Sequence, residues 1–312
     1  MPTGPSDVER IVVTGLGPVS SIGIGAAAFT EGLRAGRCGI SAIASFDPTG
    51  FPVTLAGEVH DFVPEPMLHR VDPREWGRSA QLAAAAARLA VQDAALDLDR
   101  VDASRVGAVM GTTSGESQVV EAVTAELVAG GFGAMSPRLL AQMPAGRLAD
   151  AVSTELGISG ETLTLTTACS ASNYAIGYAF DCLATGEADV MVAGGADSVC
   201  RWAHAGFYRL GALSERNCRP FDRDRAGILT AEGGVALVLE TLAHATARGA
   251  RILAEVLGYG VNCDAHHPVA PDASSIADCM RLAHANAAVK PADIDYICAH
   301  GTGTPSNDLA EA

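Results

Sequence analysis

Cys169 combines a reactive side chain with a position in the sequence where chemistry is favoured. It follows the segment ETLTLTTA and precedes the helical pattern SASNYAIGYAFDCLATG, which places it at a strand-to-helix junction. At the first turn of a helix, unpaired N–H groups and the positive end of the macrodipole stabilise a thiolate and lower the thiol pKa. The same N–H groups can hold an oxyanion. We therefore predict that Cys169 is a nucleophile.

His300 is the second candidate. It follows the apolar run IDYICA in a turn of Gly and Thr residues, which leaves the imidazole and several hydroxyls free to face a ligand. Each residue alone also has an ordinary interpretation, as a small buried cysteine or as a structural histidine. A Cys and a His that both follow strands in small-residue turns match the pairing of a nucleophile with its partner.

The elements that must position these residues follow from hydrophobic periodicity. Ala and Leu have high helix propensity and predict a helix over 79–96. In the helix after Cys169, we expect Ile176, Phe180 and Leu183 to form the buried face. Strands that are nearly all apolar and alternate with helices predict an α/β fold with a largely parallel sheet covered on both faces. The predicted strands are 10–15, 105–111, 161–168, 189–195, 235–240, 252–260 and 294–301.

Composition excludes several classes of function. The 312 residues carry 36 acidic and 21 basic side chains, a net charge of −15, which disfavours a nucleic-acid partner. The uncharged stretch 11–30 is interrupted by glycines and a proline and lacks a basic start, so we expect neither a membrane span nor a signal peptide, and a cytoplasmic location. Eight scattered cysteines without a C-x-x-C pair predict neither a disulfide framework nor a metal site.

Together these motifs resemble the β-ketoacyl-acyl-carrier-protein synthases, particularly the elongating synthase II type and the ketosynthases of type II polyketide pathways. The resemblance implies a thiolase-like fold of α-β-α-β-α layers. It also implies an N-terminal half over 1–250, which carries the nucleophile, and the start of a C-terminal half over 251–312. The motifs are TACSAS (167–172), HGTGTPSND (300–308), VVTGLGPVS (12–20), DVMVAGGAD (189–197), RPFDRDRAG (219–227) and AEGGVALVLE (231–240).

The chemistry implied by the resemblance is a decarboxylative condensation of an acyl thioester with a malonyl thioester. Cys169 matches the acylated nucleophile, and His300 matches one of two histidines that stabilise charge on the malonyl thioester oxygen. Thr302 and Thr304 match positions along the pantetheine arm, and His267 and Phe207 match substrate-binding positions. No resident cofactor or metal is expected, because phosphopantetheine arrives on the acyl carrier protein.

The sequence departs from the family after the His300 motif. The family's active-site lysine, second histidine and Gly-Phe-Gly loop are not found, since Lys290 precedes the motif and no histidine follows it. We therefore expect a C-terminally truncated chain that is inactive alone. Asp308 and Glu311 match acidic positions near the family's lysine, and buried without that cation they would be costly unpaired charges.

Carrier-protein docking requires a local basic patch on this acidic chain. Arg70, Arg74 and Arg78 occur at four-residue spacing and would share one helix face if that stretch is helical. The alternative is a solvated charged face without a partner.

Three alternatives stay open. Gly15-Leu16-Gly17 after a strand is similar to the loop of a NAD-dependent oxidoreductase, although the third glycine and the acidic residue are missing. Asp264, His266 and His267 suggest a metal, but adjacent histidines on a strand point in opposite directions. Ketosynthase-like subunits that lack the nucleophile act as chain-length partners, a role that Cys169 argues against. TLTLTT (162–167) could pair across a two-fold axis in a homodimer or in a heterodimer with such a partner.

Overall fold

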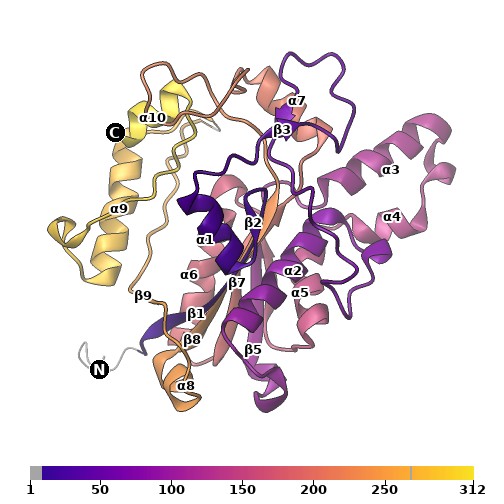
Figure 1. The fold of residues 1–312 in the computed structure, drawn as a ribbon. Coiled ribbons are helices and arrows are strands. Elements are labelled where there is room, and N and C mark those ends of the chain that lie inside the picture. The colour runs from indigo at the N-terminus through magenta and orange to yellow at the C-terminus, as the bar shows by residue number, and fades with distance from the viewer. Residues whose placement is uncertain (1–8, 268) are drawn as a thin grey trace.

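A seven-stranded mixed sheet forms the centre of the protein (Figure 1). The structure is a computed structural model that describes residues 9–267 and 269–312. The strand order is β2-β1-β8-β7-β5-β6, with β9 alongside β1, and β3 and β4 form a separate small hairpin. The strands are β1 (Ile11–Ser20), β2 (Gly23–Ile24), β3 (Ser41–Ala42), β4 (Leu55–Ala56), β5 (Val106–Gly111), β6 (Thr162–Leu165), β7 (Val190–Asp197), β8 (Gly233–Thr241) and β9 (Ala254–Val256).

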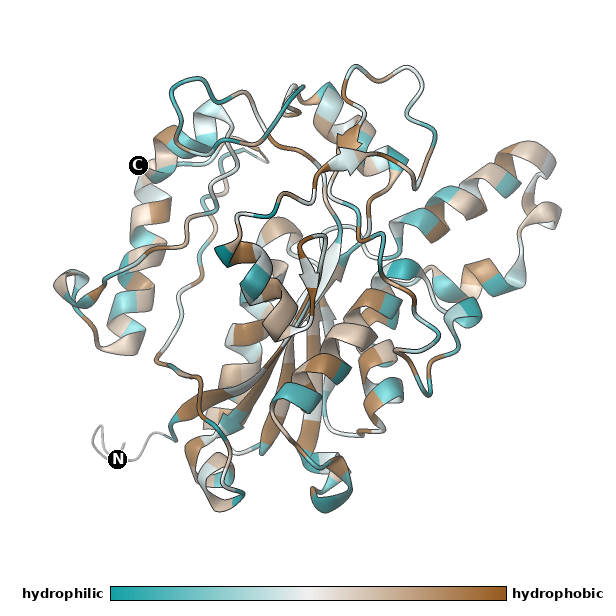
Figure 2. Ribbon diagram, in the orientation of Figure 1, coloured by the Kyte–Doolittle hydropathy of each residue, from teal (hydrophilic) through white to brown (hydrophobic). Residues whose placement is uncertain are grey.

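Helices cover both faces of this sheet. α2 (Arg78–Asp93) and α5 (Arg147–Leu156) pack on one face, and α6 (Ala171–Ala184) packs on the other. Figure 2 shows the hydrophobic residues gathered in the strands between these helices. The remaining helices are α1 (Ala26–Arg34), α3 (Ser117–Gly130), α4 (Pro137–Gln142), α7 (Arg201–Arg209), α8 (Leu242–Ala247), α9 (Ala273–Ala287) and α10 (Pro305–Glu311). No helix in the described ranges is long and apolar enough to span a bilayer.

The predicted strand directions are partly wrong. The α/β class is confirmed, but among the strand pairs of the described residues only β5 with β6 and β5 with β7 are parallel, whereas β8 runs antiparallel to both β7 and β1. A nearly continuous apolar strand reports burial on both faces, and a mixed sheet between two helical layers provides the same burial. The apolar pattern of the strands therefore identified the helical layers on both faces of the sheet but not the directions of the strands.

Two glycines of β1 serve helix packing. β1 continues through them to Ser20, so no turn follows the strand at Gly15. A β-carbon at Gly15 would lie 2.2 Å from the carbonyl oxygen of Ala90, and one at Gly17 would lie 1.9 Å from that of Ala86. The glycines thus let α2 pack directly on the strand. The dinucleotide-loop alternative is wrong.

The buried face of α6 differs from the predicted one. Leu183 is fully buried as expected, but Ile176 and Phe180 are only half-buried. Small residues at four-residue spacing, Ala171, Ala175 and Ala179, face the sheet instead. Small side chains allow the helix to approach β5 and β7 closely. The close approach of α6 to the sheet therefore places alanines, rather than the larger Ile176 and Phe180, on the buried face.

Most of the strand residues predicted near the C-terminus do not form strands in the described ranges. The predicted strand 252–260 shrinks to β9, which pairs with β1, and 294–301 forms no strand. In that segment Tyr296 is 80% exposed and Ile297 is 65% exposed. A β-branched run becomes a strand only where a neighbouring strand supplies hydrogen bonds. Of these two predicted segments, only 252–260 has such a neighbour among the described residues, where β9 pairs with β1. The division at residue 250 stays a prediction.

Candidate active site

Cys169 lies where the chain turns from β6 into α6. A 3₁₀ turn at Ala168–Ser170 joins the two elements, and Cys169 is exposed within it. Ala168 has a φ of 53°, a left-handed conformation that is strained for a residue with a side chain. Gly111 at the end of β5 admits the first turn of α6, because a β-carbon there would be 2.3 Å from the carbonyl carbon of Ala171. The thiol is thus presented on a tight, strained turn.

His300 is held through its backbone by α10. The carboxylate of Glu311 accepts hydrogen bonds from the N–H groups of His300 and Gly301, each at 2.8 Å. The side-chain amide of Asn307 donates to the same carboxylate at 2.8 Å. These contacts fix the turn and leave the imidazole ring of His300 unconstrained by Glu311.

The structure brings the Cys169 thiol and the His300 imidazole together. The interaction with His300 is the main cause that lowers the pKa of the Cys169 thiol, against an opposing effect of burial. In return, the interaction with Cys169 raises the pKa of His300, and the negative charges of Glu311 and Asp308 add to this effect. Such mutual shifts favour a thiolate–imidazolium pair, the reactive form of a cysteine nucleophile.

Asp308 and Glu311 are not the unpaired charges that the sequence suggested. Asp308 is buried, yet its carboxylate accepts hydrogen bonds from the N–H groups of Phe221 at 2.7 Å and Gly303 at 3.1 Å. Arg225 lies 3.5 Å from the same carboxylate. Backbone donors therefore satisfy both carboxylates, with one guanidinium beside Asp308, and the pKa values of both carboxyls lie below their ordinary range, because these hydrogen bonds outweigh burial.

Thr302 and Thr304 lie in the same turn as His300 and are half-buried. Their hydroxyl oxygens are 2.9 Å apart, and the Thr304 hydroxyl accepts from the N–H of Asn307 as the N-cap of α10. In this structure, both hydroxyls therefore also organise the turn.

Two predicted substrate-binding residues lie in other segments. His267 is exposed between β9 and α9, where its Nδ1 accepts from the N–H of Val269 at 3.2 Å. Phe207 is half-buried in α7. The interactions found in the described residues do not connect either one to Cys169, so their roles stay predictions.

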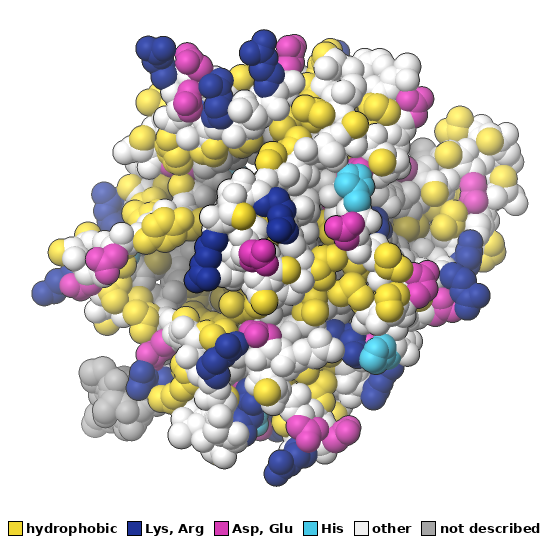
Figure 3. Space-filling model, in the orientation of Figure 1, with side chains coloured by type: hydrophobic (Ala, Val, Ile, Leu, Met, Phe, Trp, Pro, Cys, Tyr) yellow, Lys and Arg dark blue, Asp and Glu magenta, His cyan; other side chains and the backbone are white. Residues whose placement is uncertain are grey.

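The predicted basic helix face is wrong. Pro73 starts a 3₁₀ turn and α2 begins only at Arg78, so Arg70, Arg74 and Arg78 share no helix. Arg78 is bound to the buried Glu232 at 2.6 Å, and Arg74 pairs with Asp72 at 2.7 Å. On the face in Figure 3, basic and acidic side chains are interspersed.

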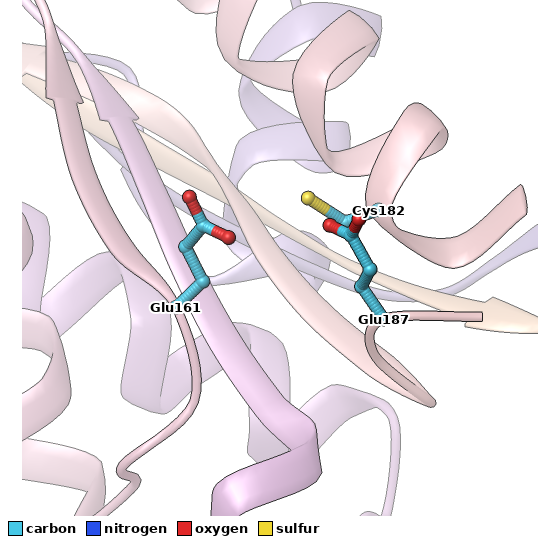
Figure 4. Close-up of side chains that lie close together, drawn as sticks. All are labelled: Glu161, Cys182 and Glu187. Atoms are coloured by element: carbon cyan, nitrogen blue, oxygen red, sulfur yellow. The ribbon is translucent and has the colours of Figure 1, made fainter. Parts of the chain in front are cut away.

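One group in the described residues has a geometry that could hold a metal. Ligand atoms of Glu161, Cys182 and Glu187 lie within 4.8 Å of one another (Figure 4). The Tyr178 hydroxyl already donates to Glu161. Burial and the negative charges of the two glutamates raise the pKa of the Cys182 thiol to about 11, which keeps it protonated at neutral pH. Three possible ligand atoms, one of them already bound by a hydroxyl, are fewer than the four of a closed structural site, so we assign no metal to this group.

Comparison with known proteins decides the family. Residues 8–245 match the family model for the β-ketoacyl synthase N-terminal domain, and residues 253–312 match that for the C-terminal domain. The chain belongs to the β-ketoacyl synthase family. The predicted resemblance and thiolase-like fold are thereby confirmed.

Individual relatives agree with this assignment. The 3-oxoacyl-[acyl-carrier-protein] synthase 2 of Synechocystis sp. is 36% identical over 312 residues, which cover 97% of this chain and 75% of the relative. The solved ishigamide ketosynthase/chain length factor has a TM-score of 0.95 and 49% identity, over 97% of this chain and 76% of that one. A type II polyketide ketosynthase, solved in complex with its acyl-carrier protein, has a TM-score of 0.87 and 31% identity over the same shares.

The β-ketoacyl synthase relationship establishes the reaction class. The chain is of the condensing acyltransferase class that acts in fatty acid or polyketide chain elongation, as the resemblance implied, and the expectation that it is inactive alone stays a prediction. The family does not by itself assign the catalytic steps to side chains of this chain. The interaction of His300 with the Cys169 thiol bears on that assignment.

Proposed function

We propose that Cys169 carries the growing acyl chain. The Cys169 thiolate attacks the carbonyl carbon of an acyl thioester, the carrier thiolate leaves and takes the proton of the His300 imidazolium, and an acyl-cysteine remains. The N–H of Cys169 serves as half of the oxyanion hole for this step. The observation that carries the proposal is the imidazole of His300 beside an exposed thiol whose pKa it lowers.

His300 acts in the second half-reaction. Loss of CO₂ from the malonyl thioester leaves negative charge on the thioester oxygen, and a donor aimed at that oxygen lowers the barrier. The resulting carbanion attacks the acyl-cysteine carbonyl and expels the Cys169 thiolate. Thr302 and Thr304, which lie on the same turn, contact the pantetheine arm. The enzyme needs no resident cofactor, because the carrier protein brings phosphopantetheine.

Intact-mass spectrometry tests the first step. Incubation with an acyl-carrier protein thioester should add one acyl mass to the chain, and Cys169→Ala should abolish the adduct. Cys38→Ala is the matched control, because Cys38 is another exposed free thiol. An adduct that persists in Cys169→Ala, or that disappears in Cys38→Ala, would contradict the assignment.

Partners follow from similar proteins. The solved neighbours include a ketosynthase with its acyl-carrier protein and a ketosynthase/chain length factor. We propose that this chain likewise accepts substrates from a carrier protein and pairs with a ketosynthase-like subunit or with a second copy. β6 is the last strand in the sheet order, which leaves its outer edge available for pairing.

Light scattering coupled to size exclusion distinguishes these assemblies. For the chain alone, a molar mass of two chains would indicate a homodimer. After co-expression with a ketosynthase-like subunit lacking the cysteine, a mass equal to the sum of the two different subunits would indicate a heterodimer. A monomer under both conditions would refute pairing through β6.

A further inference from the structure

Asp197 is a charged residue near the nucleophile that the proposed reaction does not use. It is the last residue of β7, which runs parallel to β5 with Gly195 opposite Gly111. This register carries Asp197, which still pairs with Gly233 of β8, beyond the end of β5 to the level of Thr113. It therefore reaches the loop that follows β5.

The Asp197 carboxylate binds three consecutive residues of that loop. It accepts from the Thr112 hydroxyl at 2.7 Å, from the Thr113 N–H at 2.9 Å and from the Ser114 N–H at 3.0 Å. The Thr112 hydroxyl in turn accepts from the N–H of Gly115 at 2.9 Å. One side chain thus determines the path of residues 112–115.

The same loop lies next to the segment that leads to Cys169. The N–H of Thr112 donates to the carbonyl of Leu165 at 3.0 Å, at the end of β6 and four residues before the nucleophile. β5, β6 and β7 run in parallel here, so the segments that follow them meet at one edge of the sheet.

Asp197 also places a carboxylate in the neighbourhood of the thiol. Its contacts in the described residues are N–H and O–H donors, with no ion pair among them. Its negative charge makes a minor contribution that opposes ionisation of Cys169, whose pKa is lowered mainly by His300. The charge also adds to the raised pKa values of Glu116 and Cys200, for which burial is the larger cause.

We propose that Asp197 is a positioning residue for the nucleophile, which anchors residues 112–114 beside the Cys169 turn while holding a negative charge against the thiol. The inference rests on the proposed role of Cys169. His300 favours ionisation of the Cys169 thiol, whereas the charge of Asp197 disfavours it. A thiolate that is stabilised less is intrinsically more nucleophilic, so Asp197 trades a smaller thiolate fraction for a more reactive one.

The test separates the charge from the anchor. In Asp197→Asn the pH profile of Cys169 alkylation by iodoacetamide, followed by peptide mass, should shift to lower pH. The rate constant on the acidic limb should rise by up to about twofold, and acyl transfer from a carrier thioester should fall roughly tenfold. Thr112→Val removes one anchoring hydroxyl without changing charge and should leave the alkylation profile in place.

Asp189→Asn is the matched control, because Asp189 directly precedes the same strand at its other end and pairs with Arg105. A profile in Asp197→Asn that coincides with wild type, or one that Asp189→Asn shifts equally, overturns the proposal. If Asp197→Asn fails to fold, Asp197→Glu retains the charge and should keep the wild-type alkylation profile. A shifted profile in that variant also counts against the inference. Alkylation does not require acyl transfer, so a wild-type chain that forms no acyl adduct would refute the proposed function while leaving this comparison decisive.

Discussion

Replacing Gly111 by alanine should displace the nucleophile without touching it. The new β-carbon would lie 2.3 Å from the carbonyl carbon of Ala171, 2.4 Å from the nitrogen of Ser172 and 2.5 Å from the Ala171 oxygen. All three are backbone atoms of the first turn of α6, so no side chain can rotate away. Ordinary contact between such atoms requires a movement of about 1 Å. Overpacking of this kind costs about 1–3 kcal/mol, and a 1 Å displacement of a reacting group costs about 100-fold in rate.

Urea unfolding and acylation of Cys169 measure the two effects of Gly111→Ala. The midpoint should fall, and acyl transfer should slow about 100-fold. Gly206→Ala is the control, because a β-carbon in that part of α7 meets nothing within 4 Å. That control should be as stable as wild type or about 0.5–1 kcal/mol more stable, since alanine favours a helix. Wild-type stability and acylation in Gly111→Ala would show that this contact does not hold the turn.

Three further changes follow from contacts described above or from the buried sheet. His300→Ala removes the main cause of the lowered Cys169 pKa, so both alkylation at pH 7 and acylation of Cys169 by a carrier thioester should slow. Ala168→Gly relieves the left-handed strain and should raise the free energy of unfolding by up to about 1 kcal/mol, whereas Ala168→Val should lower it. Glu240→Gln leaves the half-buried Arg248 without the carboxylate that it contacts at 2.6 Å and should cost about 3 kcal/mol by urea unfolding at pH 7.

The Glu240 change also has a pH signature. Hydrogen bonds from Arg248, Thr14 and His244 together outweigh burial and lower the pKa of this carboxyl below its ordinary value of 4.5. The stabilisation is therefore present above that value and is lost as the pH falls through the lower folded-state pKa. The loss of stability on acidification should be smaller in Glu240→Gln. Parallel pH curves for the two proteins would contradict this reasoning, as would unchanged alkylation in His300→Ala or an equally stable Ala168→Val.

The sequence was most informative where local chemistry and element ends coincide. Cys169 and His300 each follow a segment of β-type pattern in a small-residue turn, and the structure places them together although 131 positions separate them. The element preceding His300 is nevertheless not a strand. The turn alone, held by α10, suffices to present the ring.

Contacts between residues far apart in the chain could not be predicted from the sequence. Asp197 ends the motif DVMVAGGAD, and its position at a strand end was the available signal, but the register that aligns it with Thr113 exists only in the folded sheet. Pro73 was a readable signal against a helix through residues 70–78, whereas the spacing of Arg70, Arg74 and Arg78 could not reveal that Glu232 binds Arg78 from 154 positions away. Spacing describes neighbours along one element, whereas these contacts join different elements.

The exposed thiol has a practical consequence for chemical labelling. Four other cysteines in the described chain, Cys38, Cys218, Cys263 and Cys298, are also open to solvent. Solvent access therefore does not single out Cys169, whereas its imidazole neighbour does. A mild electrophile used at near-neutral pH and low dose should tag this one position first, which makes it a natural handle for a fluorophore or a covalent inhibitor.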